Sequence, residues 1–179
     1  DKLKKNITLH PSEKKDIKNL PATYLICYFN GFSDAKKQLF MAKPYLKPYP
    51  SIYPTVDAIV HKNDMILLGH KHGEKQWRMP GGHVDVKDVT LETAVIREVH
   101  EECGIIEVGI PKYFMSCPID DRRYKGTKDT VYTIVFEVEY IYGNVVAGED
   151  LEEVKWFHKD SISKLNIIPS HKEILEAYV

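Results

Sequence analysis

Three glutamates lie close together in the segment REVHEECGI, residues 97–105. If this segment is helical, Glu98 and Glu102 stand one turn apart, because successive residues turn by about 100° around a helix axis. Glu101 then lies about 60° to the other side of Glu98. Grouped carboxylate oxygens suit hard cations such as Mg²⁺ or Mn²⁺. The segment therefore indicates either a divalent-metal site or a solvated acidic helix face.

The position of these acids favours the first alternative. They occupy the last turns of the expected helix, near the negative end of its dipole, and like charges one turn apart repel by roughly 0.2–0.5 kcal/mol. Val95 and Val99 fall on an adjacent arc that can face the core, so the acidic arc borders the buried side. A bound cation would offset both penalties, and Arg97 can hold one carboxylate through a bidentate pair.

The pattern of apolar residues predicts the elements that must position this helix. The helix is expected to start near Thr90 and to end at Gly104, and a terminal helix is expected to be capped by Ser170. Strands are expected at residues 55–61, 65–70, 76–84, 131–141 and 153–159, the first two as a hairpin. This mixture indicates an α/β or α+β domain around a mixed β-sheet.

Residues 1–50 differ in character from the rest of the chain. The first 19 residues are lysine-rich and polar, and helices are expected at 19–31 and through AKKQLFMA. Four prolines in residues 43–54 then indicate a linker or an extended strap. We therefore predict a short helical N-terminal appendage over residues 1–50 and a separate domain over residues 51–179.

The composition narrows the class of protein. A formal net charge of −1 argues against general nucleic-acid binding, which relies on excess positive charge. No apolar run approaches the roughly 20 residues of a membrane span. Cys27, Cys103 and Cys117 form no disulfide framework, which predicts a cytoplasmic protein.

The longer segment PGGHVDVKDVTLETAVIREVHEECGI resembles the signature of the Nudix hydrolases. That signature runs glycine, five residues, glutamate, seven residues, Arg-Glu, an aliphatic residue, any residue, Glu-Glu, any residue, glycine and an aliphatic residue. Gly82 matches its first glycine, and the helical half matches without a gap through Arg97, Glu98, Val99, Glu101, Glu102, Gly104 and Ile105. The resemblance implies a Nudix α/β/α sandwich that hydrolyses diphosphates.

The same resemblance assigns roles to the acidic residues. It implies that Glu98 and Glu102 bind Mg²⁺ or Mn²⁺, that Glu101 is a further ligand or positions water, and that the carbonyl of Gly81 supplies another oxygen. One departure is visible, because the family expects a glutamate where this chain has Val89. Asp88, one residue earlier, is the acid in that position, so the loop carries one extra residue. The family's glutamate there is an accessory acid, so we expect activity to survive.

The flanking segments YPTVDAIV, PIDDRRYKGTKDT and HKEIL narrow the substrate. They resemble the Nudix half of bifunctional nicotinamide-mononucleotide adenylyltransferase/Nudix proteins, whose hydrolase acts on ADP-ribose. The resemblance implies a small nucleoside-diphosphate substrate, ADP-ribose, that is hydrolysed to AMP and ribose 5-phosphate. Alternatives are another Nudix substrate, such as a nucleotide sugar, a dinucleotide or a nucleoside triphosphate, and a non-catalytic ADP-ribose sensor. A homodimer is a further option, since it is common in this branch of the family.

Substrate contacts are expected outside the signature. Arg122 or Arg123 can bind the diphosphate, although their loop departs from the family's spacing and can instead be a charged hairpin tip. His83 can reach the substrate or be structural, and Tyr53 can stack on adenine or simply pack. The family's catalytic base is often an acid shortly before a tryptophan, which indicates Asp150 and, as second choice, Glu149.

Overall fold

The computed structural model describes residues 50–148 and 150–179. Within them, a seven-stranded sheet runs in the order β4-β6-β1-β2-β7, with β3 paired to β1 and β5 paired to β6. The strands are β1 (Ile52–Lys62), β2 (Met65–Lys71), β3 (Gly81–His83), β4 (Glu107–Val108), β5 (Lys112–Ile119), β6 (Thr130–Tyr142) and β7 (Leu151–His158). The helices are α4 (Leu91–Cys103) and α5 (Pro169–Tyr178), together with the short 3-10 helices η2 (Arg122–Tyr124) and η3 (Lys159–Lys164).

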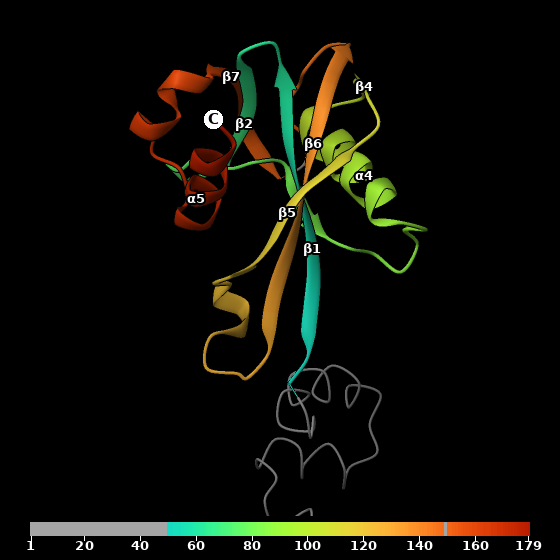
Figure 1. The fold of residues 1–179 in the computed structure, drawn as a ribbon, viewed down its shortest axis with the longest axis vertical. Coiled ribbons are helices and arrows are strands. Elements are labelled where there is room, and N and C mark those ends of the chain that lie inside the picture. Colours follow the sequence, from blue (N-terminus) through green and yellow to red (C-terminus); the bar gives the residue numbers. More distant parts are fainter. Residues whose placement is uncertain (1–49, 149) are drawn as a thin grey trace, which may run out of the picture. The chain divides into compact units, whose positions relative to one another are not determined.

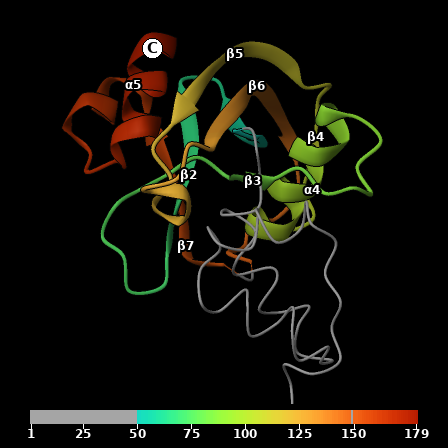
Figure 2. The same cartoon turned by 90° about the horizontal axis from the view of Figure 1, so that it is seen from below.

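Helices α4 and α5 cover opposite faces of the sheet (Figure 1, Figure 2). Successive side chains of a strand point to opposite faces, so one strand can serve two cores. In β1, Val56 and Ala58 pack in the core that includes Val99 of α4, whereas Ile59 packs in the core that includes Leu175 of α5. The α/β/α sandwich with a mixed sheet that the sequence predicts is therefore confirmed.

Strand β1 lies at the centre of the sheet and joins distant parts of the chain. It forms the predicted antiparallel hairpin with β2 and pairs in parallel with β6, from Ile52 opposite Thr130 to His61 opposite Glu139. The strand starts at Ile52, so the strap predicted over residues 43–54 is wrong for its last residues. Pro54 is tolerated because it lies near the start of the strand, where a missing N–H does little harm.

Other differences from the sequence prediction have local causes. The strand predicted over residues 76–84 is reduced to β3, and β4 and β5 were not predicted, because KYFMSCPI lacks a clear alternation. Helix α5 begins at Pro169, so Ser170 lies in its first turn instead of capping it. The helices predicted between residues 19 and 42 lie outside the described residues, and the domain boundary at residue 50 stays a prediction.

Candidate active site

Helix α4 begins and ends where its local sequence places it. The hydroxyl of Thr90 accepts a hydrogen bond from the N–H of Thr93 at 3.2 Å, and the Thr93 hydroxyl accepts one from the N–H of Thr90 at 3.0 Å. This reciprocal pair satisfies two backbone donors at the N-terminus. Gly104 ends the helix with a φ of 84°, a conformation that favours glycine. Both predicted ends of the helix are thus confirmed.

The helix buries two of its three clustered glutamates. Glu98 and Glu102 are only 9% and 5% exposed, whereas the side chain of Glu101 is 52% exposed. Burial raises the pKa of Glu98, and it raises the pKa of Glu102 to about 7. The physical cause is that a carboxylate loses its hydration on burial. These residues therefore form a concentrated acidic site and do not behave as a solvated helix face.

Arg97 holds the acidic residues in position. Its Nη1 donates to Glu98 at 2.8 Å and to Glu101 at 2.9 Å, and its Nη2 donates to the carbonyl oxygen of His83 at 3.0 Å. Two further bonds go to Asp88, from Nε at 3.0 Å and from Nη2 at 2.9 Å. A guanidinium has five N–H donors, and all of them are used here. Arg97 therefore acts as a structural centre for the site.

The loop before α4 shows how the extra residue is accommodated. The N–H of Asp88 donates to the carbonyl oxygen of Asp85 at 3.0 Å, and the N–H of Asp85 donates to Oδ2 of Asp88 at 2.8 Å. This tight turn directs the Asp88 side chain toward Arg97 and leaves Val89 88% exposed. Asp88, and not residue 89, is therefore the acid that pairs with the arginine of the signature.

The double glycine lets β3 lie directly against the glutamates. The N–H of Gly81 donates to Oε2 of Glu102 at 3.0 Å. A Cβ on Gly81 would lie 2.3 Å from the carbonyl oxygen of Val56, and one on Gly82 would lie 2.6 Å from a carboxylate oxygen of Glu98. The contact at Gly81 is with backbone, so a glycine is required there by close approach. The contact at Gly82 is with the end of the Glu98 side chain, so a Cβ there would require this carboxylate or the strand to move.

The buried glutamates open into a cavity of about 770 Å³. Of the residues predicted to act in the site, Gly81, His83, Glu98, Glu102, Arg123 and Asp150 line this cavity. Arg97, Glu101 and Asp88 are not among its lining residues. The structure thus brings six predicted residues together around one space, from β3, α4, η2 and the turn before β7.

Asp150 is placed by the loop that follows β6. The N–H of Gly148 donates to the carbonyl oxygen of Glu102 at 2.9 Å, so this loop covers the C-terminal end of α4. Asp150 then pairs with Lys71 of β2, with 2.9 Å between Nζ and Oδ2. The hydrogen bond from Lys71 lowers the pKa of Asp150. Glu149, the second choice for a base, lies outside the described residues.

The predicted substrate-contacting residues divide into two groups. Arg123 donates to both carboxylate oxygens of Asp121, and His83 lines the same cavity. Burial and the positive charge of Arg123 lower the pKa of His83. Tyr53 does not line the cavity, and its ring lies 4.5 Å from that of Tyr124. The adenine-stacking role of Tyr53 stays a prediction.

Sequence reasoning missed several polar residues of the cavity. Lys71, Arg78, Asp57 and His171 all line it. Asp57 had a local signal, because it is a lone acid in the apolar stretch TVDAIV. His171 had none, since only the packing of α5 brings it to the cavity.

The residues present fit a divalent cation in their chemistry. Glu98, Glu102 and the Gly81 carbonyl offer only oxygen atoms, and the raised pKa of Glu102 reflects a buried carboxylate without a full counter-charge. Within residues 50–148 and 150–179, no three His, Cys, Asp or Glu side chains form a preassembled metal site. Mg²⁺ does not require one, because it usually takes one or two protein carboxylates plus water and phosphate oxygens.

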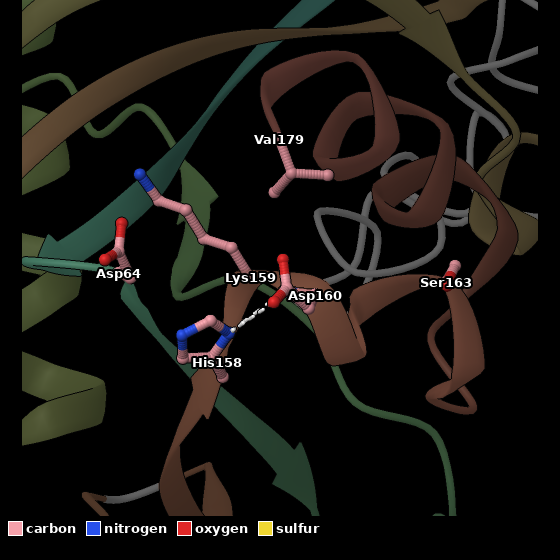
Figure 3. A pocket seen from close by; sticks show the side chains of 6 residues that line it. All are labelled: Asp64, His158, Lys159, Asp160, Ser163 and Val179. Carbon is pink, nitrogen blue, oxygen red and sulfur yellow. Dashed lines mark hydrogen bonds and ion pairs between the residues drawn. The ribbon is translucent and has the colours of Figure 1, made fainter.

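A second cavity, of about 470 Å³, lies where η3 meets the end of α5 (Figure 3). Its lining residues are Asp64, His158, Lys159, Asp160, Ser163 and Val179. The side chains of His158 and Asp160 point toward each other, with 3.4 Å between Nδ1 and Oδ2. No residue predicted to act in catalysis or binding lines this cavity.

The sandwich fold and the acidic cavity together define an enzyme of the diphosphate-hydrolase class. The family profile described as NUDIX domain matches residues 52–178. The chain therefore belongs to the Nudix family, and it is a Nudix pyrophosphohydrolase. A second profile, described as a domain of unknown function (DUF5929), matches residues 1–62.

Among curated proteins, the chain is similar to an ADP-ribose pyrophosphatase of Methanocaldococcus jannaschii. The two are 30% identical over 147 residues, which cover 80% of this chain and 80% of that protein. The chain is also 32% identical over 117 residues to the NAD-capped RNA hydrolase NudC of Vibrio vulnificus. That match covers 64% of this chain but only 41% of NudC, so the chain spans less than half of this relative.

Solved structures show the same fold. The E. coli ORF135 protein matches with a TM-score of 0.59 and 21% identity, over 74% of this chain and 93% of that chain. The NUDIX domain of Shewanella oneidensis NrtR, complexed with ADP ribose, matches with a TM-score of 0.58 and 18% identity. This match covers 80% of this chain and 96% of that chain. At these identities, the likeness supports the fold alone.

No helix in the described part of the chain is long and apolar enough to cross a membrane.

Proposed function

We propose that this Nudix enzyme hydrolyses ADP-ribose to AMP and ribose 5-phosphate with the help of Mg²⁺ or Mn²⁺. The observation that carries the proposal is the shared cavity, in which Glu98 and Glu102 lie with the cationic residues Lys71, Arg78 and Arg123. Carboxylates suit the cation, and guanidinium and ammonium groups suit diphosphate oxygens. Its volume of about 770 Å³ falls in the usual range for ligand pockets. The similarity to the ADP-ribose pyrophosphatase supports the same substrate.

The chain's own residues would do three things in this reaction. Arg123 and His83 would bind the diphosphate, Arg97 would hold Glu98 in place, and Asp150 would accept a proton from the attacking water. The water oxygen forms a bond to phosphorus while the bridging P–O bond breaks, and the leaving phosphate departs with its electron pair. When bound, the cation would activate the water and offset the charge that develops on phosphorus.

Glu101 and Asp88 would act through Arg97. Both carboxylates accept hydrogen bonds from its guanidinium, and neither lines the cavity. We therefore place Glu98, Glu102 and the Gly81 carbonyl at the cation and treat Glu101 as a residue that positions the others. Arg122, the alternative to Arg123, stays a prediction.

NAD-capped RNA, or the NAD moiety itself, is a second candidate substrate, because of the similarity to NudC. A panel of ADP-ribose, NAD, NAD-capped RNA, nucleotide sugars and nucleoside triphosphates, each with Mg²⁺ and with Mn²⁺, separates these possibilities. We expect the highest kcat/KM for ADP-ribose, with AMP and ribose 5-phosphate identified by chromatography. Tight ADP-ribose binding without hydrolysis of any compound would contradict the proposal and favour a sensing role.

The wider assignments stay predictions. These are the appendage over residues 1–50, the likeness to bifunctional adenylyltransferase/Nudix proteins, the homodimer and the cytoplasmic location. Gel filtration with light scattering would test the homodimer directly.

A further inference from the structure

A buried polar pair lies in the cavity wall and has no part in the mechanism above. His171 lies in the first turn of α5 and is 6% exposed, and Asp57 lies in β1 and is 5% exposed. Nε2 of His171 lies 3.6 Å from Oδ1 of Asp57. Burying polar groups is unfavourable unless each finds a partner, so the partners of this pair show what it does.

The hydrogen bonds of His171 define its tautomer. The backbone N–H of Met79 donates to Nδ1 at 2.9 Å, so Nδ1 carries no proton. The proton of the neutral ring is then on Nε2, which faces Asp57. Burial lowers the pKa of His171, which agrees with a neutral ring. The other carboxylate oxygen of Asp57 accepts a hydrogen bond from the hydroxyl of Thr133.

These contacts hold the segment that leads into β3. The N–H of Ala58 donates to the carbonyl oxygen of Pro80 at 2.8 Å, and Asp57 lies opposite Gly81 in the β1–β3 register. A Cβ on Gly81 would lie 2.4 Å from Oδ1 of Asp57, so the carboxylate packs directly against this glycine. The N–H of Gly81 in turn donates to Glu102 at 3.0 Å. A continuous path therefore runs from His171 to the candidate metal-binding residues.

Attachment of α5 does not by itself require a histidine here. Ile174 and Leu175 of the same helix are buried in the core, and the hydroxyl of Tyr178 donates to Glu137 at 2.7 Å. An apolar side chain at position 171 could fill the space, but it would leave the buried N–H of Met79 without an acceptor. The imidazole of His171 therefore serves to bind the segment 79–81, through the N–H of Met79.

We propose that His171 and Asp57 are positioning residues that hold the segment 79–81, so that the Gly81 carbonyl and Glu102 keep the geometry required for hydrolysis. This inference rests on the proposed function of the Gly81–Glu102 site. His171 bonds the start of the segment through Met79, and Asp57 supports the ring and Gly81 together.

Three substitutions at one position test the proposal. H171L removes both polar contacts, H171N keeps an oxygen close to the position of Nδ1, and H171Q keeps a nitrogen close to that of Nε2. We expect H171L to lower kcat about 10–100-fold, as is typical when a residue supporting a metal site is lost. KM should change by less than about twofold, because ground-state binding is not the target. H171N should recover most of kcat, and H171Q should not.

A readout without substrate accompanies the kinetics. We expect H171L to weaken the binding of Mn²⁺ to the substrate-free protein by about 10-fold or more in a calorimetric titration. Amide hydrogen exchange at Met79 should also become faster in H171L and stay slow in H171N. If the wild type binds Mn²⁺ but hydrolyses no diphosphate, the proposed function fails, whereas these two measurements still decide the positioning role.

Tyr178→Phe is the matched control, because it removes a hydrogen bond of the same helix to Glu137, and neither of these two residues lines the cavity. We expect it to lower the unfolding temperature and to leave kcat and Mn²⁺ affinity unchanged. The proposal is overturned if H171L behaves like Tyr178→Phe, or if H171N and H171Q are equally impaired. If H171L does not fold, the comparison of kcat between H171N and H171Q alone decides whether His171 is a positioning residue.

Discussion

The guanidinium of Arg97 holds the carboxylate of Asp88 through two hydrogen bonds, from Nε at 3.0 Å and from Nη2 at 2.9 Å. The pair closes the loop between the double glycine and α4, and it leaves the remaining donors of Arg97 for Glu98, Glu101 and the carbonyl of His83. The one-residue displacement of the acid thus leaves the arginine fully bonded. The loop absorbs the extra residue, and the helix stays in register with the glycines.

The Asp88–Arg97 pair predicts a specific dependence of stability on pH. The hydrogen bond from Arg97 lowers the pKa of Asp88 from 3.8 to about 2. The unfolded chain therefore binds the proton more readily than the folded one, so the stabilisation is full above about pH 4 and is lost as the pH falls toward 2. Asp88→Asn should lower the free energy of unfolding at pH 7 and have a shrinking effect below about pH 4. Urea unfolding of both proteins from pH 7 to pH 3 measures this, and a constant difference would contradict it.

Glu102→Gln should separate activity from stability. The substitution removes one candidate ligand charge, so we expect kcat to fall at least about 100-fold, comparable to the loss of one transition-state stabilising group. Because burial raises the pKa of Glu102 to about 7, the neutral amide should not destabilise the metal-free protein at pH 8. Steady-state kinetics and thermal unfolding check the two expectations. Glu92→Gln, at an exposed position of the same helix, is the control, and a near-normal rate for Glu102→Gln would refute the metal-site assignment.

Gly82→Ala tests the close approach of β3 to α4. The added Cβ would lie 2.6 Å from a carboxylate oxygen of Glu98, so either the strand or the carboxylate must move. A displacement of about 1 Å in a catalytic group can lower the rate about 100-fold, and we expect a loss of that order in kcat. Gly109→Ala is the matched control, because its Cβ would meet the nearest atom at 3.4 Å, an acceptable contact. Equal activity in the two variants would show that Glu98 tolerates displacement.

The pairing of Lys71 with Asp150 predicts a shift in the pH–rate profile. If Asp150 is the catalytic base, Asp150→Asn should lower kcat by about 100-fold or more. Lys71 lowers the pKa of Asp150, so Lys71→Met should raise that pKa and move the acid limb of the profile to higher pH. The profile of kcat from about pH 3 upward measures the shift, because the ordinary pKa of an aspartate is about 3.9 and that of Asp150 is lower. An unmoved acid limb, together with an active Asp150→Asn variant, would point to another base, with Glu149 as the next residue to substitute.

The ends of helix α4 and the grouping of its acidic residues could be predicted from the sequence, because both depend on neighbouring residues. The Thr90 cap, the Gly104 end and the spacing of Arg97, Glu98 and Glu102 all depend on residues within a few turns of one another. Helical periodicity alone placed Glu98 and Glu102 on the side of the helix that borders the core. Gly82 was also part of a short-range sequence signature, and the structure shows that it lies close to the carboxylate of Glu98.

The walls of the cavity were decided by tertiary structure. Met79 and His171 are separated by 92 residues, and Lys71 and Asp150 by 79. Their contacts depend on β1, β2 and α5 packing around one sheet, a result of burying apolar side chains that local patterns do not encode. The same packing turns Tyr53 toward Tyr124 and outside the set of cavity-lining residues. The clustered acids of α4 and their partner Arg97 could thus be recognised from neighbouring residues. The contacts of Lys71 and His171 could be found only once distant strands and helices had come together.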